Sequence, residues 1–266
     1  MRIIRRKTAL ALMIAGMMLS SGCGRSRQGI TLAGSTAFQP FAEKLADMYM
    51  ETHPGVSVTV HGGGSAMGIY AADVGVAHIG MADLVRLPKE ADGMENMVVA
   101  RDGIAIALNP ANAVNGLTME QVRGIFSGTI KNWREVGGVD RAISVISREA
   151  GSGTRSSFEQ IIEARALAPD ALIQDSNGTI RETVANDPYA IGYLSHGLIN
   201  DRIKPVPVDG FKCEEKDIAD GNYKLIRPVF LVYKPDIPPA CKAFLEYLLT
   251  PEAQELLHKN GLIRVK

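Results

Sequence analysis

The strongest constraint on the fold of this chain is a pattern that occurs three times along it. Each time, a short apolar run ends in a loop of Gly, Ser and Thr, and an apolar sequence with helical spacing follows. The three loops occupy residues 34–36, 62–65 and 151–154. Strand, loop and helix in succession are typical of parallel strands joined by right-handed crossovers. The pattern therefore predicts an α/β fold.

Apolar runs with a period of two or of 3.6 predict the other elements. We expect strands at residues 30–33, 56–60, 77–81, 97–100, 104–108, 143–146, 190–194, 205–208 and 229–233. We expect helices at residues 38–49, 66–72, 118–126, 177–185, 241–249 and 251–259, and another that carries Phe158. The helix from Thr118 begins with a capping box that includes Gln121. Residues 209–222 are polar and hinge-like.

Composition excludes several classes of protein. Of the 266 residues, 46% are hydrophobic and 22% are charged, which is too apolar for a disordered chain. The 3 cysteines are too few for a disulfide-dense mini-protein. The length allows one large domain or two lobes of roughly 100 to 130 residues. The aromatic residues expected in the core are Trp133, Phe38, Phe41, Phe126 and Phe158.

The N-terminus has the layout of a secretory signal peptide. Four basic residues lie within the first seven positions, and residues 9–19 contain nothing more polar than Gly16. This run is shorter than the roughly 20 apolar residues of a transmembrane helix, and the small residues 20–22 follow it. We therefore predict a lipoprotein signal peptide at residues 1–22 and an extracytoplasmic location, periplasmic or at the cell surface.

Cys23 follows the predicted leader. The sequence from Leu19 to Cys23 resembles a bacterial lipobox, in which the cysteine becomes the lipidated first residue, although Leu19 lies four positions before it instead of three. Residues 23–29 are then expected to be a tether. Loss of four positive charges from a chain with 29 basic and 29 acidic residues leaves a mature net charge of −4. Cys213 and Cys241 are candidates for a disulfide in an oxidising compartment.

The three Gly, Ser and Thr loops suit an anion. Ligands of open α/β sheets bind at the carboxyl ends of the strands, where these loops lie. A helix N-terminus presents N–H groups without acceptors, Gly permits close approach of the backbone, and hydroxyls donate hydrogen bonds. An ordinary helix cap explains any one loop, but three in one chain, one of them just after Arg148, favour an anion site.

Other chemistries do not fit these loops. A dinucleotide fingerprint around Gly62 would need Gly in place of Met67, and no loop is followed by Gly-Lys-Ser/Thr. Ser152 has Ala150 and Thr154 two residues away, so it lacks the Gly-x-Ser-x-Gly nucleophile elbow. The 5 histidines have no metal-ligand spacing. We therefore expect no enzymatic activity, no metal, no cofactor and no nucleic-acid partner.

Five segments of the chain together share a pattern with a known family. They are residues 33–38 (Ala-Gly-Ser-Thr-Ala-Phe), 64–65 (Gly-Ser), 80–83 (Gly-Met-Ala-Asp), 117–128 with 131–133 (Lys-Asn-Trp), and 147–154 (Ser-Arg-Glu-Ala-Gly-Ser-Gly-Thr). They resemble the PstS-type phosphate-binding proteins of bacterial phosphate ABC transporters. The similarity extends from about Ile30 to the C-terminus, and the last segment is the most specific.

The resemblance implies a two-lobed periplasmic-binding-protein fold of type II. Each lobe would be a mostly parallel sheet flanked by helices, with the ligand cleft between the lobes. Lobe one would comprise residues 30–108 and 229–266, and lobe two residues 109–228. Because the chain would cross twice, the lobes could close as units around a ligand.

Carried over position by position, the resemblance also implies the residues that contact phosphate. They are Thr36, the backbone N–H of Ala37, Ser65, Asp83, Arg148, Ser152, Gly153 and Thr154, and the adjacent Ser35 is a further candidate. Arg148 supplies a planar, permanently charged fork for bidentate contact with a tetrahedral oxyanion. Asp83 is explained if the ligand keeps a proton, as monohydrogen phosphate does, because an ionised carboxylate only accepts hydrogen bonds. Sulfate offers no such donor and would leave Asp83 unpaired.

The interpretation that follows is a lipid-anchored, monomeric solute-binding protein. It would capture inorganic phosphate and deliver it to the permease subunits of an ABC transporter. Two alternatives keep the same fold: a phosphate-sensing or scavenging lipoprotein, and a receptor for another oxyanion. A third is an extracytoplasmic phosphoester hydrolase with Ser152 or Ser65 as nucleophile, for which the sequence shows neither a positioned base nor a metal cluster.

Overall fold

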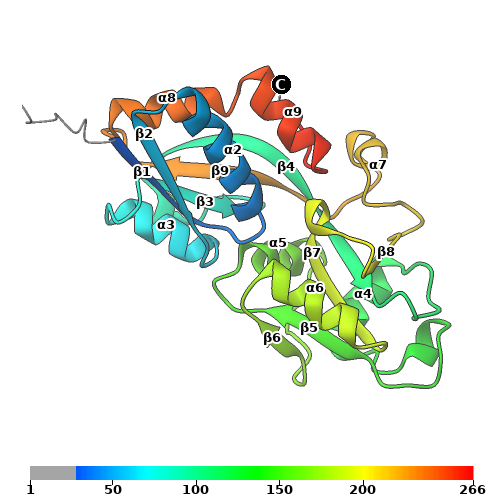
Figure 1. The fold of residues 1–266 in the computed structure, drawn as a ribbon. Helices are drawn as coiled ribbons and strands as arrows, with labels where there is room; N and C mark the ends of the chain where they lie inside the picture. The colour runs from blue at the N-terminus through cyan, green and yellow to red at the C-terminus, as the bar shows by residue number, and fades with distance from the viewer. Residues whose placement is uncertain (1–27, 266) are drawn as a thin grey trace, which may run out of the picture.

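A computed structural model describes residues 28–265 of the chain (Figure 1). The predicted signal peptide, Cys23 and most of the predicted tether lie outside these residues. Gln28 and Gly29 pair with Val56 and Ser57 as part of the first strand, so the tether prediction is two residues too long. In the described part of the chain, no helix combines the length and the apolar character needed to cross a bilayer.

The elements follow the predicted order. The strands are β1 (Gln28–Gly34), β2 (Val56–His61), β3 (Ile79–Asp83), β4 (Glu95–Leu108), β5 (Ser144–Arg148), β6 (Leu172–Gln174), β7 (Ala190–Ser195), β8 (Lys204–Val206) and β9 (Ile226–Tyr233). The helices are α2 (Gln39–Thr52), α3 (Ser65–Asp73), α4 (Met119–Phe126), α5 (Gly153–Ile161), α6 (Asn177–Asn186), α7 (Glu215–Ala219), α8 (Pro239–Tyr247) and α9 (Pro251–Lys259). Strand β6 was not predicted, because it is only three residues long and exposes both Leu172 and Ile173.

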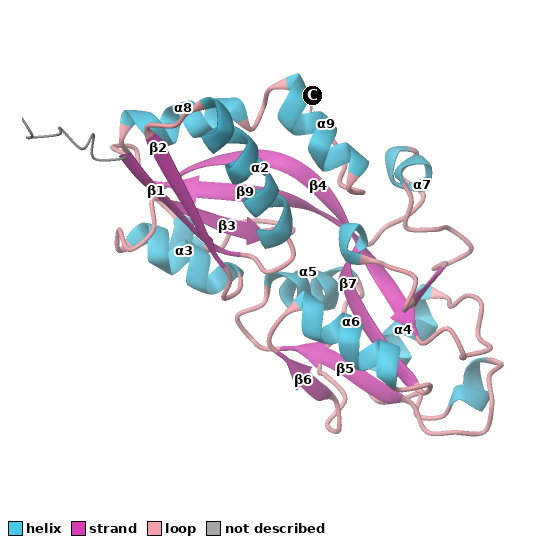
Figure 2. Cartoon of the chain, in the orientation of Figure 1, coloured by secondary structure: helices cyan, strands magenta, loops and turns pink. Residues whose placement is uncertain are grey.

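The described strands form one sheet in the order β2-β1-β3-β9-β4-β7-β5-β6, with β8 beside β4. Lobe one contains β1 to β3 with α2, α3, α8 and α9, and lobe two contains β5 to β8 with α4 to α7 (Figures 1 and 2). Parallel pairing joins β1 to β2 and β3, and β5 to β6 and β7. Strands β4 and β9 pass between the lobes and pair antiparallel with their neighbours. The fold is therefore the two-lobed α/β architecture that was predicted.

Strand β4 replaces the two strands predicted at residues 97–100 and 104–108. Its first part, from Glu95 to Gly103, pairs with β9, and its last part, from Ile104 to Leu108, pairs with β7. The prediction of a break was wrong because the charge of Asp102 is neutralised within the sheet. Asp102 lies directly opposite Arg227 of β9, and their side chains form an ion pair at 2.9 Å.

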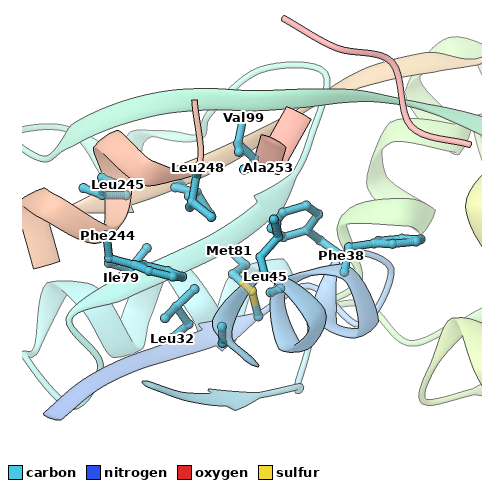
Figure 3. Packing of buried hydrophobic residues seen from close by; sticks show 14 of the residues in the cluster. Leu32, Phe38, Leu45, Ile79, Met81, Val99, Phe244, Leu245, Leu248 and Ala253 are labelled. Carbon is cyan, nitrogen blue, oxygen red and sulfur yellow. The ribbon is translucent and has the colours of Figure 1, made fainter. Parts of the chain in front are cut away.

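Each lobe has its own hydrophobic core. In lobe one, alternate residues of the strands face α2, α8 and α9, so that Leu32, Met81, Leu45 and Phe244 pack together (Figure 3). The other face of the sheet packs against α3. In lobe two, Phe126 and Phe158 pack edge to face, with ring centroids 4.7 Å apart. All five aromatic residues predicted as core are buried.

The start of α4 confirms the predicted capping box. The backbone N–H of Gln121 donates to Thr118 Oγ1 at 3.1 Å, and the backbone N–H of Thr118 donates to Gln121 Oε1 at 2.8 Å. The polar stretch 209–222 contains the short helix α7, and Ile218 of this helix belongs to the core of lobe two. The chain crosses between the lobes in β4 and β9 instead.

The candidate disulfide is not formed. Cys213 and Cys241 are both buried free thiols. They belong to two different hydrophobic clusters, Cys213 to that of lobe two and Cys241 to that of lobe one. Burial raises the pKa of both thiols, that of Cys241 to about 11. Both side chains are therefore packing residues in this structure.

Candidate functional site

The three predicted loops meet at one edge of the sheet. They follow the carboxyl ends of β1, β2 and β5, as expected for parallel strands. The backbone N–H of Ala66 donates to the carbonyl of Gly151 at 3.2 Å and joins the second loop to the third. Thr36 in the first loop accepts hydrogen bonds from Asn177 at the start of α6. Residues from both lobes therefore form one site.

Asp83 ends β3 among these loops and is 1% exposed. Its Oδ1 accepts a hydrogen bond from Ser65 Oγ at 2.9 Å, and its Oδ2 accepts one from Thr154 Oγ1 at 3.1 Å. Nη2 of Arg227 lies 2.6 Å from the same Oδ2. A carboxylate has about four lone-pair positions. Oδ1, which accepts from one side chain, can therefore accept a further hydrogen bond.

Asp83 also belongs to a closed ring that was not predicted from the sequence; hydrogen bonds form it together with the ion pair between Arg227 and Asp83. The members of this ring are all at most 1% exposed, and they come from both lobes and from the crossing strands. They are Asp83, Arg227, Asp102, Ser195, Asn177 and Thr154.

The far side of the ring is built by β4, β7 and α6. Ser195 Oγ donates to Asp102 Oδ1 at 2.8 Å, and the backbone N–H of Ser195 donates to Asn177 Oδ1 at 3.1 Å. Asn177 Nδ2 then donates to Thr154 Oγ1 at 3.3 Å. Burial raises the pKa of Asp102, and the positive charge of Arg227 opposes this effect. The ring thus connects the site to both crossing strands.

Arg148 is buried, but one edge of its guanidinium is already occupied. Nε and Nη2 donate to the two carboxylate oxygens of Glu149 at 2.9 and 2.8 Å, and Nη2 also donates to the carbonyl of Asp175 at 3.2 Å. Within residues 28–265, Nη1 has no hydrogen-bond partner. In this structure Nε and Nη2 of Arg148 are therefore occupied by Glu149 and Asp175, and Nη1 remains to donate.

The backbone of Arg148 is fixed by Tyr193. The backbone N–H of Arg148 donates to the Tyr193 hydroxyl at 3.3 Å, and that hydroxyl lies 2.8 Å from Ser147 Oγ. Burial raises the pKa of Tyr193 to about 12. The hydroxyl therefore stays neutral and acts as a fixed hydrogen-bonding group behind the site.

In the first loop the structure separates the roles of adjacent residues. Ser35 Oγ accepts hydrogen bonds from the backbone N–H groups of Ala37 and Phe38 at 3.2 and 3.1 Å. The N–H of Ala37, which was predicted to contact phosphate, thus closes the turn before α2. Thr36 Oγ1 accepts from Asn177, so its own hydroxyl proton is left to donate.

The helix N-termini of α3 and α5 provide backbone donors. Ser65 is the first residue of α3, and Gly153 and Thr154 are the first residues of α5. The first N–H groups of a helix have no acceptor within it. The hydroxyls of Ser65 and Thr154 already donate to Asp83. The groups that these two residues have left to donate to an anion are their backbone N–H groups. Ser152 Oγ accepts from the N–H of Arg155 and keeps its proton.

A groove of about 970 Å³ opens beside the site. In lobe one it is lined by α3 and by residues between 84 and 90, and in lobe two by residues 150–153 and α5. Ser65, Ser152 and Gly153 lie in its wall. The groove therefore gives a route between the solvent and the two helix N-termini.

The hydrolase alternative has no support in this geometry. Ser65 Oγ donates to a carboxylate, and Ser152 Oγ accepts from a backbone N–H. In the part of the chain that the structure describes, neither hydroxyl has a histidine as hydrogen-bond partner. A serine nucleophile is activated by an adjacent base that takes its proton, and this base is most often a histidine.

The structure brings the predicted residues together at one edge of the sheet, but the residues that hold them were not predicted from the sequence. Asn177 follows β6, which was not predicted, so its position at a strand-to-helix junction was not recognised. Asp102 and Arg227 were missed because both lie outside the predicted strands, Asp102 between two of them and Arg227 two residues before a third. The available signal was a charged residue directly beside an apolar strand, since a charge that becomes buried needs a partner.

The fold and the site together define a class of protein. Two lobes, joined by crossing strands, enclose a buried polar site that combines helix N-termini, hydroxyl groups and arginine. This is the arrangement of a two-lobed solute-binding protein with a site for an anion.

Comparison with known proteins gives the family. The model of the PBP superfamily domain matches residues 20–252. The phosphate-binding protein PstS of Bacillus subtilis is 31% identical over 278 residues, which cover 96% of this chain and 93% of that protein. The chain belongs to the PBP superfamily and, within it, to the PstS-type phosphate-binding proteins. Proteins of this family are binding proteins and not enzymes.

Solved structures agree with this assignment. A phosphate ABC transporter substrate-binding protein of Clostridium perfringens, solved with bound phosphate, is 36% identical with a TM-score of 0.88, over 90% of this chain and 100% of that chain. An ABC-type phosphate transport receptor of Vibrio cholerae is 35% identical with a TM-score of 0.74, over 88% and 99% of the two chains.

The contact between α5 and β3 generates a prediction for Gly153. A Cβ at this position would overlap Ser65 Oγ and lie 2.6 Å from the carbonyl oxygen of Asp83. Gly153→Ala should therefore push α5 away from β3 and lower the free energy of unfolding by about 1 to 3 kcal/mol, as measured by denaturant unfolding. In the matched control Gly151→Ala, the nearest atom to the new Cβ is 3.8 Å away, and little change is expected. Equal stability of the two variants would contradict the packing described.

Proposed function

We propose that this protein is an extracytoplasmic solute-binding protein that captures inorganic phosphate between its lobes. The observation that carries the proposal is the environment of Asp83. A buried carboxylate, which accepts hydrogen bonds from Ser65 and Thr154, lies beside the N-termini of α3 and α5. An anion that also donates a proton suits this combination, and monohydrogen phosphate is such an anion.

The proposed binding arrangement assigns a role to each part of the site. Asp83 Oδ1 accepts a hydrogen bond from the protonated oxygen of the ligand. The donors are the Thr36 and Ser152 hydroxyls, Nη1 of Arg148, and the backbone N–H groups at the starts of α3 and α5. Ser35 and Ala37 shape the first loop. Phosphate enters through the groove between α3 and α5. The buried ring to which Asp83 belongs excludes water from the inner side of the bound phosphate.

The names of the relatives support the proposed ligand and its use. The Clostridium perfringens protein was solved with bound phosphate and is described as an ABC transporter substrate-binding protein. The Vibrio cholerae protein is described as a phosphate transport receptor. We therefore propose that this protein, as a monomer, delivers phosphate to the permease subunits of an ABC transporter.

Delivery requires that the lobes open and close. We propose that the two lobes move as units, and that Ile104 to Leu108 move with lobe two because they pair with β7 and pack in its core. The connections between these units are β4 and β9, which pair with each other; β9 also pairs with β3 in lobe one, and β4 also pairs with β7 in lobe two. A small change of twist in these two strands would move the lobes as units.

Selectivity between phosphate and sulfate tests the role proposed for Asp83. Calorimetry on the mature, unlipidated protein should show tight binding of phosphate and much weaker binding of sulfate, because sulfate leaves Asp83 without a donor. Asp83→Asn, whose amide can donate, should reduce the ratio of sulfate Kd to phosphate Kd by at least about tenfold. The exposed Asp47→Asn on α2 is the matched control. A parent protein that binds sulfate as well as phosphate would show that the proposed role of Asp83 is wrong.

Arg148 should contribute to the affinity for both phosphate and sulfate, because its attraction to an anion does not require that the anion carry a proton. We expect Arg148→Ala to weaken phosphate binding by about 2 to 5 kcal/mol through loss of a buried charge contact, as measured by the same calorimetry. The exposed Arg165→Ala changes the net charge equally and should bind like the parent. Tight binding by Arg148→Ala would place the site elsewhere.

Membrane attachment is proposed to occur through a lipid on Cys23, after removal of residues 1–22. Expression of the full chain in bacteria grown with labelled palmitate should give a labelled protein in the membrane fraction. Cys23→Ser should lose the label, whereas Cys213→Ser, which changes a buried packing residue, should keep it. Label that persists in Cys23→Ser would rule out this anchor.

A further inference from the structure

Arg227 is a fully buried cation outside the proposed set of phosphate contacts. Its side chain is 0% exposed, and Nη2 lies 2.6 Å from Asp83 Oδ2 and 2.9 Å from Asp102 Oδ2. In the described chain, Nε and Nη1 have no hydrogen-bond partner. Within the described residues, the guanidinium of Arg227 therefore pairs with these two carboxylates.

The strand register explains how one arginine reaches both carboxylates. Asp102 of β4 lies directly opposite Arg227 in the antiparallel pair with β9. Asp83 of β3 lies opposite Val229, two residues further along β9. Because residues two apart in a strand point to the same face, Arg227 lies diagonally across from Asp83 and can contact it.

The charges of this group are not balanced. One guanidinium faces two carboxylates, and Asp83 is among the causes that raise the pKa of Asp102. Ser195 supplies an additional hydrogen bond to Asp102 but not to Asp83. A buried carboxylate needs a counter-ion, and among the described residues Arg227 is the cation in contact with Asp83. The acceptor role proposed for Asp83 therefore depends on Arg227 as well as on the hydroxyls of Ser65 and Thr154.

We propose that Arg227 is a positioning residue that holds Asp83 as a charged hydrogen-bond acceptor and thereby sets the preference of the site for phosphate over sulfate. The inference rests on the proposed function, because it concerns the same anion site. Arg227 does not contact the anion. It acts through Asp83, from a strand that passes between the lobes.

The test compares the ratio of sulfate Kd to phosphate Kd, measured by calorimetry at neutral pH. In Arg227→Met this ratio should fall at least about tenfold, because Asp83 then gains donor character and accepts less well. Arg227→Lys, which keeps a positive charge, should restore most of the ratio. If the role of Arg227 were purely structural, the substitution would weaken the binding of both anions by the same factor. An unchanged ratio in a folded Arg227→Met protein would therefore overturn the proposal.

A second pair of variants protects the test against misfolding, since removal of one partner of a buried ion pair is strongly destabilising. In Asp102→Asn, Asp83 is the one remaining carboxylate that pairs with Arg227. The ratio of sulfate Kd to phosphate Kd in this variant should not fall. Asp102→Asn combined with Arg227→Met differs from that variant only at Arg227, leaves one unpaired carboxylate where Arg227→Met alone leaves two, and should show the tenfold lower ratio. Equal ratios in these two variants would also overturn the proposal. If the parent protein binds neither anion, the proposed function itself fails, which is a distinct outcome.

Discussion

The buried guanidinium of Arg227 allows charged groups to occupy the place where the two lobes join. Removing a carboxylate from water costs several kcal/mol unless it is paired, and both Asp83 and Asp102 are 1% exposed. The register of β9 against β3 and β4 brings Arg227 to both of them. This pairing lets β4 continue through Asp102 from one lobe into the other, and it leaves a carboxylate at the centre of the candidate site.

Around Asp83 the site uses local dipoles and hydroxyl groups, and the net charge of the protein is irrelevant to it. The predicted mature chain is acidic, yet charges more than about 8 Å away are largely screened at physiological salt. Helix N-termini act within one turn, and here α3 and α5 begin beside Asp83. The pairing of Arg148 with Glu149 has a similar effect. The carboxylate of Glu149 compensates the charge of the guanidinium, and one nitrogen of Arg148 is left to donate to an anion.

Much of the fold could be predicted because it is encoded in short stretches of sequence. Period-two and period-3.6 patterns located the strands and helices, and the capping box at Thr118 marked the start of α4. The local signals failed where a distant partner changed their meaning. Residues 101–103 look like a break between strands until Arg227 is placed opposite Asp102. Cys213 and Cys241 look like a pair until they are found in different hydrophobic clusters.

For the candidate site, the sequence by itself determined which groups are present: three Gly, Ser and Thr loops, Asp83 and Arg148, in an order that identifies the family. Only the tertiary structure decided what each group can do. In the folded chain the Ala37 N–H closes a turn, and one edge of Arg148 pairs with Glu149. Asn177, Ser195 and Arg227 complete the ring to which Asp83 belongs. The reason is physical: a residue type fixes the donors and acceptors that a side chain carries, whereas packing and strand register decide which of them are already satisfied.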